Sequence, residues 1–159
     1  MKHLTFIFVL VISLTLSTHS MAQSNNRANA VFNCLVEEGY IPKYDKDGDI
    51  CFKAEGFNLY IDVANLSEDY IMIVLPAIYD IEEHDDIRFE AVELAMLGVC
   101  KKRKVVKARF DDTKVTLSAE MFTDPATSYN RIIPRAINAL IGSQRLFYDL
   151  LIEINKIDN

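Results

Sequence analysis

Three aspartates at alternate positions, Asp45, Asp47 and Asp49, are the first residues whose types and spacing suggest chemistry. Carboxylates in this pattern open the calcium-binding loop of an EF-hand, which also needs Gly at its sixth position and Glu at its twelfth. In a loop that starts at Asp45, those two positions hold Ile50 and Gly56. The pattern therefore favours an acidic turn that leads into a strand, with weak cation binding as the alternative.

An acidic cluster around His84 is the second candidate, because a histidine among carboxylates can serve acid–base or metal chemistry. The run is Glu82-Glu83-His84-Asp85-Asp86, and His84 is the single histidine that follows residue 22. These acids precede a predicted helix, where the helix dipole favours negative charge. Lys101-Lys102-Arg103-Lys104 lies at the other end of that helix, where positive charge is favoured. We therefore predict that both charge runs are structural.

The basic residues continue beyond that helix, and six of the nine residues from Lys101 to Arg109 are basic. A patch for anionic lipid, polysaccharide or an acidic partner is the alternative interpretation. Nucleic acid is disfavoured, because the net charge is −6 and becomes −7 once Lys2 is removed with residues 1–22. The sequence has no G-x-S-x-G motif, its five glycines are scattered, and no Cys/His spacing fits zinc. We expect no catalytic residue, no cofactor, no metal and no enzymatic activity.

Cysteine use gives a further expectation. Cys34, Cys51 and Cys100 all follow residue 22, and none belongs to a C-x-x-C pair of the kind found in thioredoxin-like redox sites. In an oxidising compartment, three cysteines predict one disulfide and one leftover thiol, with all three pairings open. The alternative is three small buried thiols.

Residues 1–22 have the pattern of a secretory signal peptide. Lys2 is positive, Phe6–Leu16 is mainly apolar, and Ser20-Met21-Ala22 places small residues at the −3 and −1 positions of a cleavage site after Ala22. The apolar run of 11 residues is short of the ~20 that a membrane-spanning helix needs. We predict a single domain over residues 23–159, located in the periplasm or outside the cell; passage across an outer membrane stays open.

The elements that must position these residues follow from hydrophobic periodicity. Helical spacing predicts helices over 27–38 and 85–99, and a long third helix after the cap and proline of Asp124-Pro125. Strand patterns predict β-strands over 50–55, 57–63, 70–75, 104–110 and 114–121, with Pro76 ending the third strand or marking a bulge. The order α-β-β-β-α-β-β-α predicts an α+β domain with an antiparallel, five-stranded sheet and helices packed on it.

The helix predicted over 85–99 is apolar on two sides. One stripe holds Ile87, Ala91, Leu94 and Ala95, and the second holds Phe89, Val92, Met96 and Val99. A helix of this kind lies between two layers or meets a partner chain. Phe89, Val92 and Met96 are therefore the predicted interaction surface.

The element order resembles the secretion-chaperone-like fold, which type III secretion chaperones share with the YbjN-type bacterial family. The similar segments are Gly39-Tyr40 after the first helix, the turn Asp45–Phe52, the hairpin Glu55-Gly56 and the strand pair Lys107–Leu117. The resemblance implies a non-enzymatic domain that often forms homodimers and holds a polypeptide partner. Those relatives are typically cytoplasmic, whereas this chain has a predicted signal peptide.

Three functions are weighed on these grounds. The first is an exported interaction protein, a homodimer that binds a polypeptide in an apolar groove or by strand addition at a sheet edge. The second is a periplasmic carrier of an apolar or anionic small ligand held between the third helix and the sheet. The third, an enzyme, needs a cleft in which His84 meets a carboxylate from elsewhere in the chain.

Overall fold

The structure is a computed structural model that describes residues 26–67, 69–84, 87–123 and 129–157. The predicted signal peptide and the Asp124-Pro125 cap lie outside the described residues. A helix over residues 26–37, here the N-terminal helix, comes first. It is followed by β1 (Lys43–Tyr44), β2 (Ile50–Ala54), β3 (Phe57–Ile61), β4 (Tyr70–Asp80), the 3₁₀ helix η1 (Ile81–Glu83), α2 (Phe89–Lys102), β5 (Val106–Asp111), β6 (Lys114–Phe122) and α3 (Tyr129–Ile157).

The fold is α+β with one antiparallel sheet, as predicted, but the sheet has six strands and not five. The strand order is β1-β2-β3-β4-β6-β5, and every neighbouring pair is antiparallel. The additional strand, β1, is only two residues long, with Lys43 opposite Cys51 and Tyr44 opposite Ile50. A strand this short is invisible to periodicity, because alternation needs at least four residues to be recognised.

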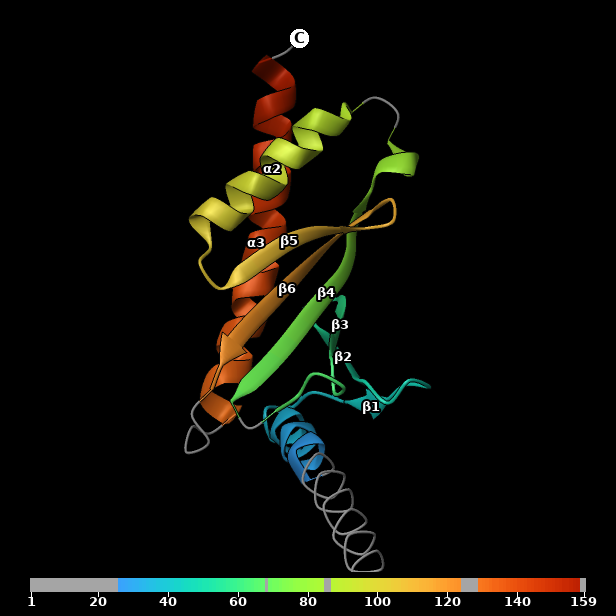
Figure 1. The fold of residues 1–159 in the computed structure, drawn as a ribbon, viewed down its shortest axis with the longest axis vertical. Helices are drawn as coiled ribbons and strands as arrows, with labels where there is room; N and C mark the ends of the chain where they lie inside the picture. Colours follow the sequence, from blue (N-terminus) through green and yellow to red (C-terminus); the bar gives the residue numbers. More distant parts are fainter. Residues whose placement is uncertain (1–25, 68, 85–86, 124–128, 158–159) are drawn as a thin grey trace, which may run out of the picture.

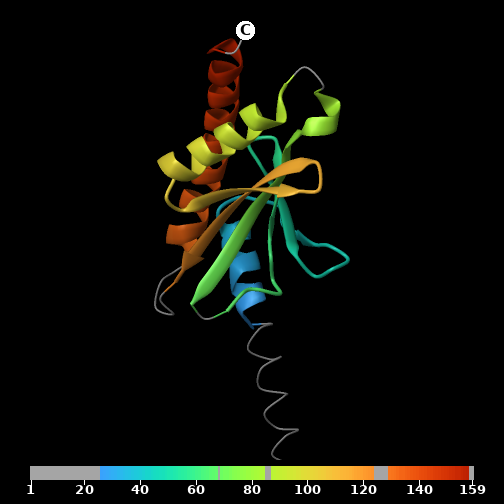
Figure 2. The same ribbon diagram turned by 45° about the horizontal axis from the view of Figure 1, so that its top comes forward.

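The longest helix, α3, runs along one face of the sheet, and Figures 1 and 2 show α2 crossing α3 beside β5. The strands turn Ile71, Ile73 and Leu75 of β4 toward this layer, and these side chains are at most 2% exposed. Facing them from α3 is an apolar stripe whose members, Ile133, Ile137, Leu140 and Phe147, are at most 1% exposed. Among the described residues, no helix is both long and apolar enough to cross a membrane.

Pro76 marks a bulge and does not end its strand, which decides between the two predicted alternatives. The register of β4 against β6 shifts between Leu75 and Tyr79, and Ala77 within this stretch has a φ of +50°. The Ala77 N–H donates to the hydroxyl of Thr116 at 3.3 Å, so the displaced backbone still has a partner. An edge or bulge position suits proline, which lacks an N–H for the ladder.

The charge runs around α2 are only partly explained by its dipole. The helix begins at Phe89, later than predicted, and Glu90 is the acid in its first turn. Glu82 and Glu83 instead belong to η1, whose N-cap Asp80 accepts the N–H of Glu82 at 3.1 Å. At the other end, Lys101 and Lys102 lie in the last turn of α2, as the dipole argument predicts.

Candidate functional site

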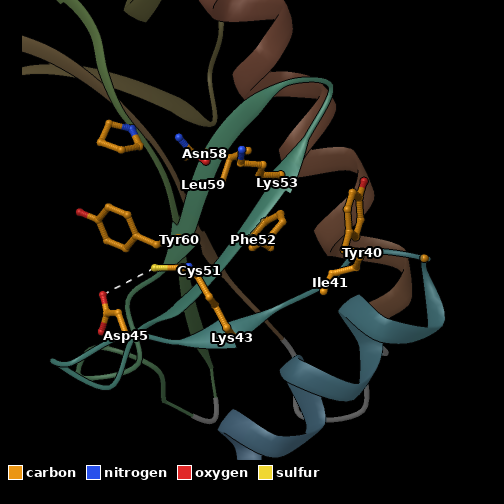
Figure 3. Close-up of a pocket in the computed structure, with 12 residues that line it drawn as sticks. Tyr40, Ile41, Lys43, Asp45, Cys51, Phe52, Lys53, Asn58, Leu59 and Tyr60 are labelled. Carbon is orange, nitrogen blue, oxygen red and sulfur yellow. Dashed lines mark hydrogen bonds between the residues drawn. The ribbon is translucent and has the colours of Figure 1, made fainter.

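An open, mainly apolar groove of about 700 Å³ follows the outer part of β2, where the chain enters β1. Figure 3 shows its side chains on both sides of β2, with Phe52 and Tyr40 on one side and Cys51 and Tyr60 on the other. The residues that line it are Gly39, Tyr40, Ile41, Lys43, Asp45, Cys51, Phe52, Lys53, Asn58, Leu59, Tyr60 and Pro76.

The segment between the N-terminal helix and β1 forms one rim of this groove. Gly39 has a φ of +86°, a backbone conformation that favours glycine, and it turns the chain out of the helix. The next residue, Tyr40, packs its ring against Phe52 at a centroid distance of 5.4 Å. Ile41 is then left 90% exposed at the rim. A large aliphatic side chain so fully in water contributes nothing to the fold by burial.

The three aspartates form the acidic turn that the sequence favours. Asp45 accepts the backbone N–H of Asp47 at 2.9 Å and of Asp49 at 3.0 Å, and its second oxygen accepts the Cys51 thiol at 3.6 Å. Desolvation opposes the charged form of Asp45, but these hydrogen bonds outweigh it and lower the pKa of the carboxyl. Asp49 accepts the N–H of Val63 at 2.9 Å. Within the part of the chain that the structure describes, no group of three or more His, Cys, Asp or Glu could hold a metal ion.

All three cysteines are free thiols, which corrects the expectation of one disulfide. They lie on separate elements: Cys34 on the N-terminal helix, Cys51 on β2 and Cys100 on α2. The alternative of three buried thiols holds in part, because Cys34 is buried, Cys51 is half-buried and Cys100 is exposed. Burial, with help from Glu38 and Glu37, raises the pKa of Cys34 to about 11, and burial likewise raises the pKa of Cys51.

A thiol-reactivity experiment checks this arrangement. We expect Ellman's reagent at pH 8 to modify Cys100 fast and Cys51 slowly, and to reach Cys34 only after unfolding, since the thiolate is the reacting form. Cys100→Ser should remove the fast phase alone. A count of one thiol in non-reducing denaturant would restore the predicted disulfide and contradict the structure.

His84 stacks on the ring of Tyr79 with a centroid distance of 4.7 Å and is exposed. The two rings belong to a shallow hollow of about 360 Å³ at the far end of α3. Its other lining residues, within the described chain, are Ile87, Tyr148, Leu151, Ile152, Asn155 and Lys156, none of which is a carboxylate. The cleft that the enzyme hypothesis requires, with an acid from elsewhere facing His84, is therefore not formed by the described residues.

The basic run divides between two places. Lys101, Lys102, Arg103 and Lys104 are exposed at the end of α2. On β5, Lys107 forms an ion pair with Glu120 of β6, whose carboxylate also accepts the hydroxyl of Ser118 at 2.8 Å. Desolvation works against the charged Glu120, yet the bonds from Lys107 and Ser118 prevail and lower its pKa. The run is thus no continuous anion-binding patch, because Lys107 is neutralised by its neighbour.

The predicted interaction surface is only partly at the surface. Val92 is 0% and Met96 8% exposed, because α2 packs that stripe against α3 and β5. Phe89 is 45% exposed and stacks on Phe110 of β5 at 5.1 Å. The large apolar side chains that α2 does expose are, besides Phe89, Leu94 at 53% and Leu97 at 49%. Val92 and Met96 therefore belong to the core, and Leu94 and Leu97 replace them as surface candidates.

Comparison with known proteins adds a neighbour in fold. No protein-family model matches the sequence, and no curated protein matches it. A solved structure that is similar is the "uncharacterized protein from Methanothermobacter thermautotrophicus", with a TM-score of 0.53 and 15% sequence identity. The match covers 77% of this chain and 94% of that chain. At this identity the likeness concerns the fold alone.

Proposed function

We propose that this chain is an exported, non-enzymatic interaction protein that binds a segment of a polypeptide partner in the groove along β2. The observation that carries the proposal is the open, mainly apolar groove with Ile41 standing 90% exposed at its rim. Peptide-binding sites of this kind combine an apolar floor with a few polar side chains that orient the ligand. Here Lys43, Asp45, Lys53 and Asn58 supply the polar side chains.

The opposite edge of the sheet, at β5, is less suited to binding a partner strand. At β5 the N–H of Ala108 donates to the Cys100 sulfur at 3.3 Å, and the N–H of Val106 donates to the Arg103 carbonyl at 3.2 Å. The C-terminal end of α2 therefore already covers this edge. A partner strand would have to displace both contacts before it could pair there.

The carrier hypothesis finds less support. It places a ligand between α3 and the sheet, where Ile137, Leu140 and Phe147 are at most 1% exposed within one continuous core. An interior packed this closely leaves no room for a guest without displacing side chains. A small apolar or anionic ligand in the groove stays an alternative outcome of the binding experiments.

We further propose that the protein is a homodimer through α2. Glu90, Leu94, Leu97 and Lys101 recur at i, i+4, i+7 and i+11, which places them on one stripe, and all four are exposed. If two copies of this stripe pack antiparallel about a two-fold axis, Leu94 meets Leu97 of the partner copy and Glu90 meets its Lys101. An interface of this symmetry must be self-complementary in shape and charge, and this stripe meets the charge condition.

Selection from a random peptide library tests the groove. The chain from residue 23 onward is immobilised, a phage-displayed library of 12-residue peptides is selected on it, and the enriched peptides are measured by calorimetry. We expect Ile41→Asp to reduce their affinity at least about tenfold, because it places a charge at the apolar rim. The matched control is Ile152→Asp, which changes another exposed isoleucine on α3, away from the groove. Equal loss in both variants, or no enrichment at all, would contradict the proposal.

A further inference from the structure

We infer that the occupant of the groove is an extended segment of the partner that pairs with the free edge of β2 at Lys53 and places an acidic side chain between Lys43 and Lys53. The inference rests on the proposed function and specifies its ligand. It follows from three features: the direction of the Lys53 backbone groups, the early end of β1, and the charge of the two lysines.

The β2–β3 hairpin fixes the direction of the Lys53 backbone groups. Its turn residues Glu55 and Gly56 have φ values of +47° and +88°, as in the two-residue type I′ turn. In such a hairpin the flanking pair, Ala54 and Phe57, exchanges both hydrogen bonds, and the pattern then alternates along the strands. Lys53, opposite Asn58, is therefore a non-hydrogen-bonded pair whose N–H and C=O point away from β3.

On that outer side β1 stops too early to reach Lys53. Its register pairs Lys43 with Cys51, and continuation by two residues would bring Ile41 opposite Lys53. Pro42 intervenes, and the chain leaves the sheet with Ile41 in solvent. Among the described residues, no backbone partner of Lys53 is found on this side. One donor and one acceptor are thus presented side by side, which is how an added strand is bound.

Two lysines, Lys43 and Lys53, line the groove at this edge, and Asp45 lines it as well, with its carboxylate held by the N–H groups of Asp47 and Asp49 and by the Cys51 thiol. Lys43 lies directly opposite Cys51, and Lys53 is two residues along β2, so all three side chains share one face of the sheet. Both lysines are exposed, and neither forms an ion pair with a described carboxylate. A partner residue that paired with Lys53 would point its side chain to this same face. Lys53 would lie directly opposite it on β2, and Lys43 would lie two positions away in line with β1. Aspartate or glutamate fits there because opposite charges across strands attract and like charges repel.

The residues on either side of that acidic residue would point to the other face. There the groove is walled by Tyr40 and Phe52, whose rings are in contact. β-branched or aromatic side chains suit this position, since they favour the extended backbone and bury apolar surface against the half-buried Tyr40 ring, behind which Phe52 is 4% exposed. The partner sequence that fits is therefore apolar–acidic–apolar in an extended segment.

Defined peptides test this chemistry by fluorescence anisotropy. The probe is fluorescein-labelled Gly-Ser-Thr-Val-Glu-Val-Thr-Ser-amide, compared with a Val-Lys-Val version and with a version N-methylated at Glu. We expect the Val-Glu-Val peptide to bind at least about fivefold more tightly than the Val-Lys-Val peptide, as two exposed charge contacts allow. We expect the N-methyl peptide to bind about tenfold more weakly than the Val-Glu-Val peptide, because its methylated nitrogen cannot donate to the Lys53 carbonyl.

Charge reversal in the protein separates this inference from a general effect. Lys53→Glu should reverse the preference toward the Val-Lys-Val peptide, whereas Lys46→Glu, at an exposed lysine outside the groove, should leave it unchanged. Equal binding of all three peptides, or no binding of the Val-Glu-Val probe, overturns the inference. If library-selected peptides are then still weakened by Ile41→Asp, the groove remains a binding site and only the acidic-strand inference fails. If the library yields no such peptides, the proposed function fails as well.

Discussion

Phe147→Ala is expected to lower the free energy of unfolding by about 3–5 kcal/mol, which is the usual cost of removing a buried phenylalanine. Phe147 lies in α3 with 0% of its side chain exposed. Its ring contacts Tyr79 of β4 at a centroid distance of 5.7 Å and Tyr148 at 5.6 Å. Truncation leaves a cavity between the helix layer and the sheet, at a point where the close-packed surroundings cannot collapse to fill it.

Urea denaturation followed by circular dichroism measures this loss. The control is Ile152→Ala in the same helix, where the side chain is 53% exposed, and there we expect a change of less than about 1 kcal/mol. Similar losses in both variants would mean that α3 does not pack on the sheet through the face that carries Phe147. A lower urea midpoint, with an unchanged dependence of the unfolding free energy on urea concentration, would identify the effect as one on stability.

The strands and helices with clear periodicity were predictable from sequence. β6, with Val115, Leu117 and Ala119 turned inward, is predicted over 114–121 and ends one residue later, since alternation over eight residues is a strong signal. The sequence does not distinguish a bulge at Pro76 from a strand end, because a proline at either position looks alike in sequence. The bulge is accompanied by a hydrogen bond from the Ala77 N–H to the hydroxyl of Thr116, which is 39 residues further along the chain.

The buried face of α2 could not be chosen from sequence. Both of its stripes are apolar, and the structure buries most of each: Ala91 and Ala95 of the first stripe and Val92, Met96 and Val99 of the second are at most 8% exposed. Packing on α3 sets which side of α2 is buried: Gly98 lies so close to α3 that a Cβ there would be 2.7 Å from a Leu150 methyl carbon. This approach turns Val92 and Met96 into the core and leaves Leu94 and Leu97 outside. A contact between residues 52 positions apart leaves no local signal.

The groove along β2 has little local sequence signal for a similar reason. Its rim residue Ile41 reads as part of a connector, and β1 is too short to be detected. The signal that was available is the pair Ile41-Pro42 before Lys43-Tyr44, in which proline interrupts a pattern that would otherwise lengthen the strand. The open edge of β2 is a consequence of that interruption.

Light scattering of the chain from residue 23 onward should give twice the monomer mass, and Leu94→Asp/Leu97→Asp should give the monomer mass. Both leucines are about half exposed and lie opposite the buried stripe of α2, so the variant is expected to fold. Two aspartates at the centre of an apolar contact would each lose water without gaining a partner, which costs several kcal/mol per dimer. An unchanged circular dichroism spectrum confirms that the monomer is folded.

Charge exchange then tests the antiparallel register of α2. Glu90→Lys sets a lysine opposite Lys101 of the partner copy, and because the axis repeats the contact, we expect the dissociation constant to rise about tenfold. Lys101→Glu should have the same effect, and the double variant Glu90→Lys/Lys101→Glu should recover the affinity, since it restores opposite charges at both contacts. Lys104→Glu, beyond the end of the helix, is the control. If the double variant loses dimer affinity by the sum of the two single losses, this register is excluded. If the wild-type protein is a monomer at 100 µM, the dimer is excluded, and the proposal for the groove is unaffected.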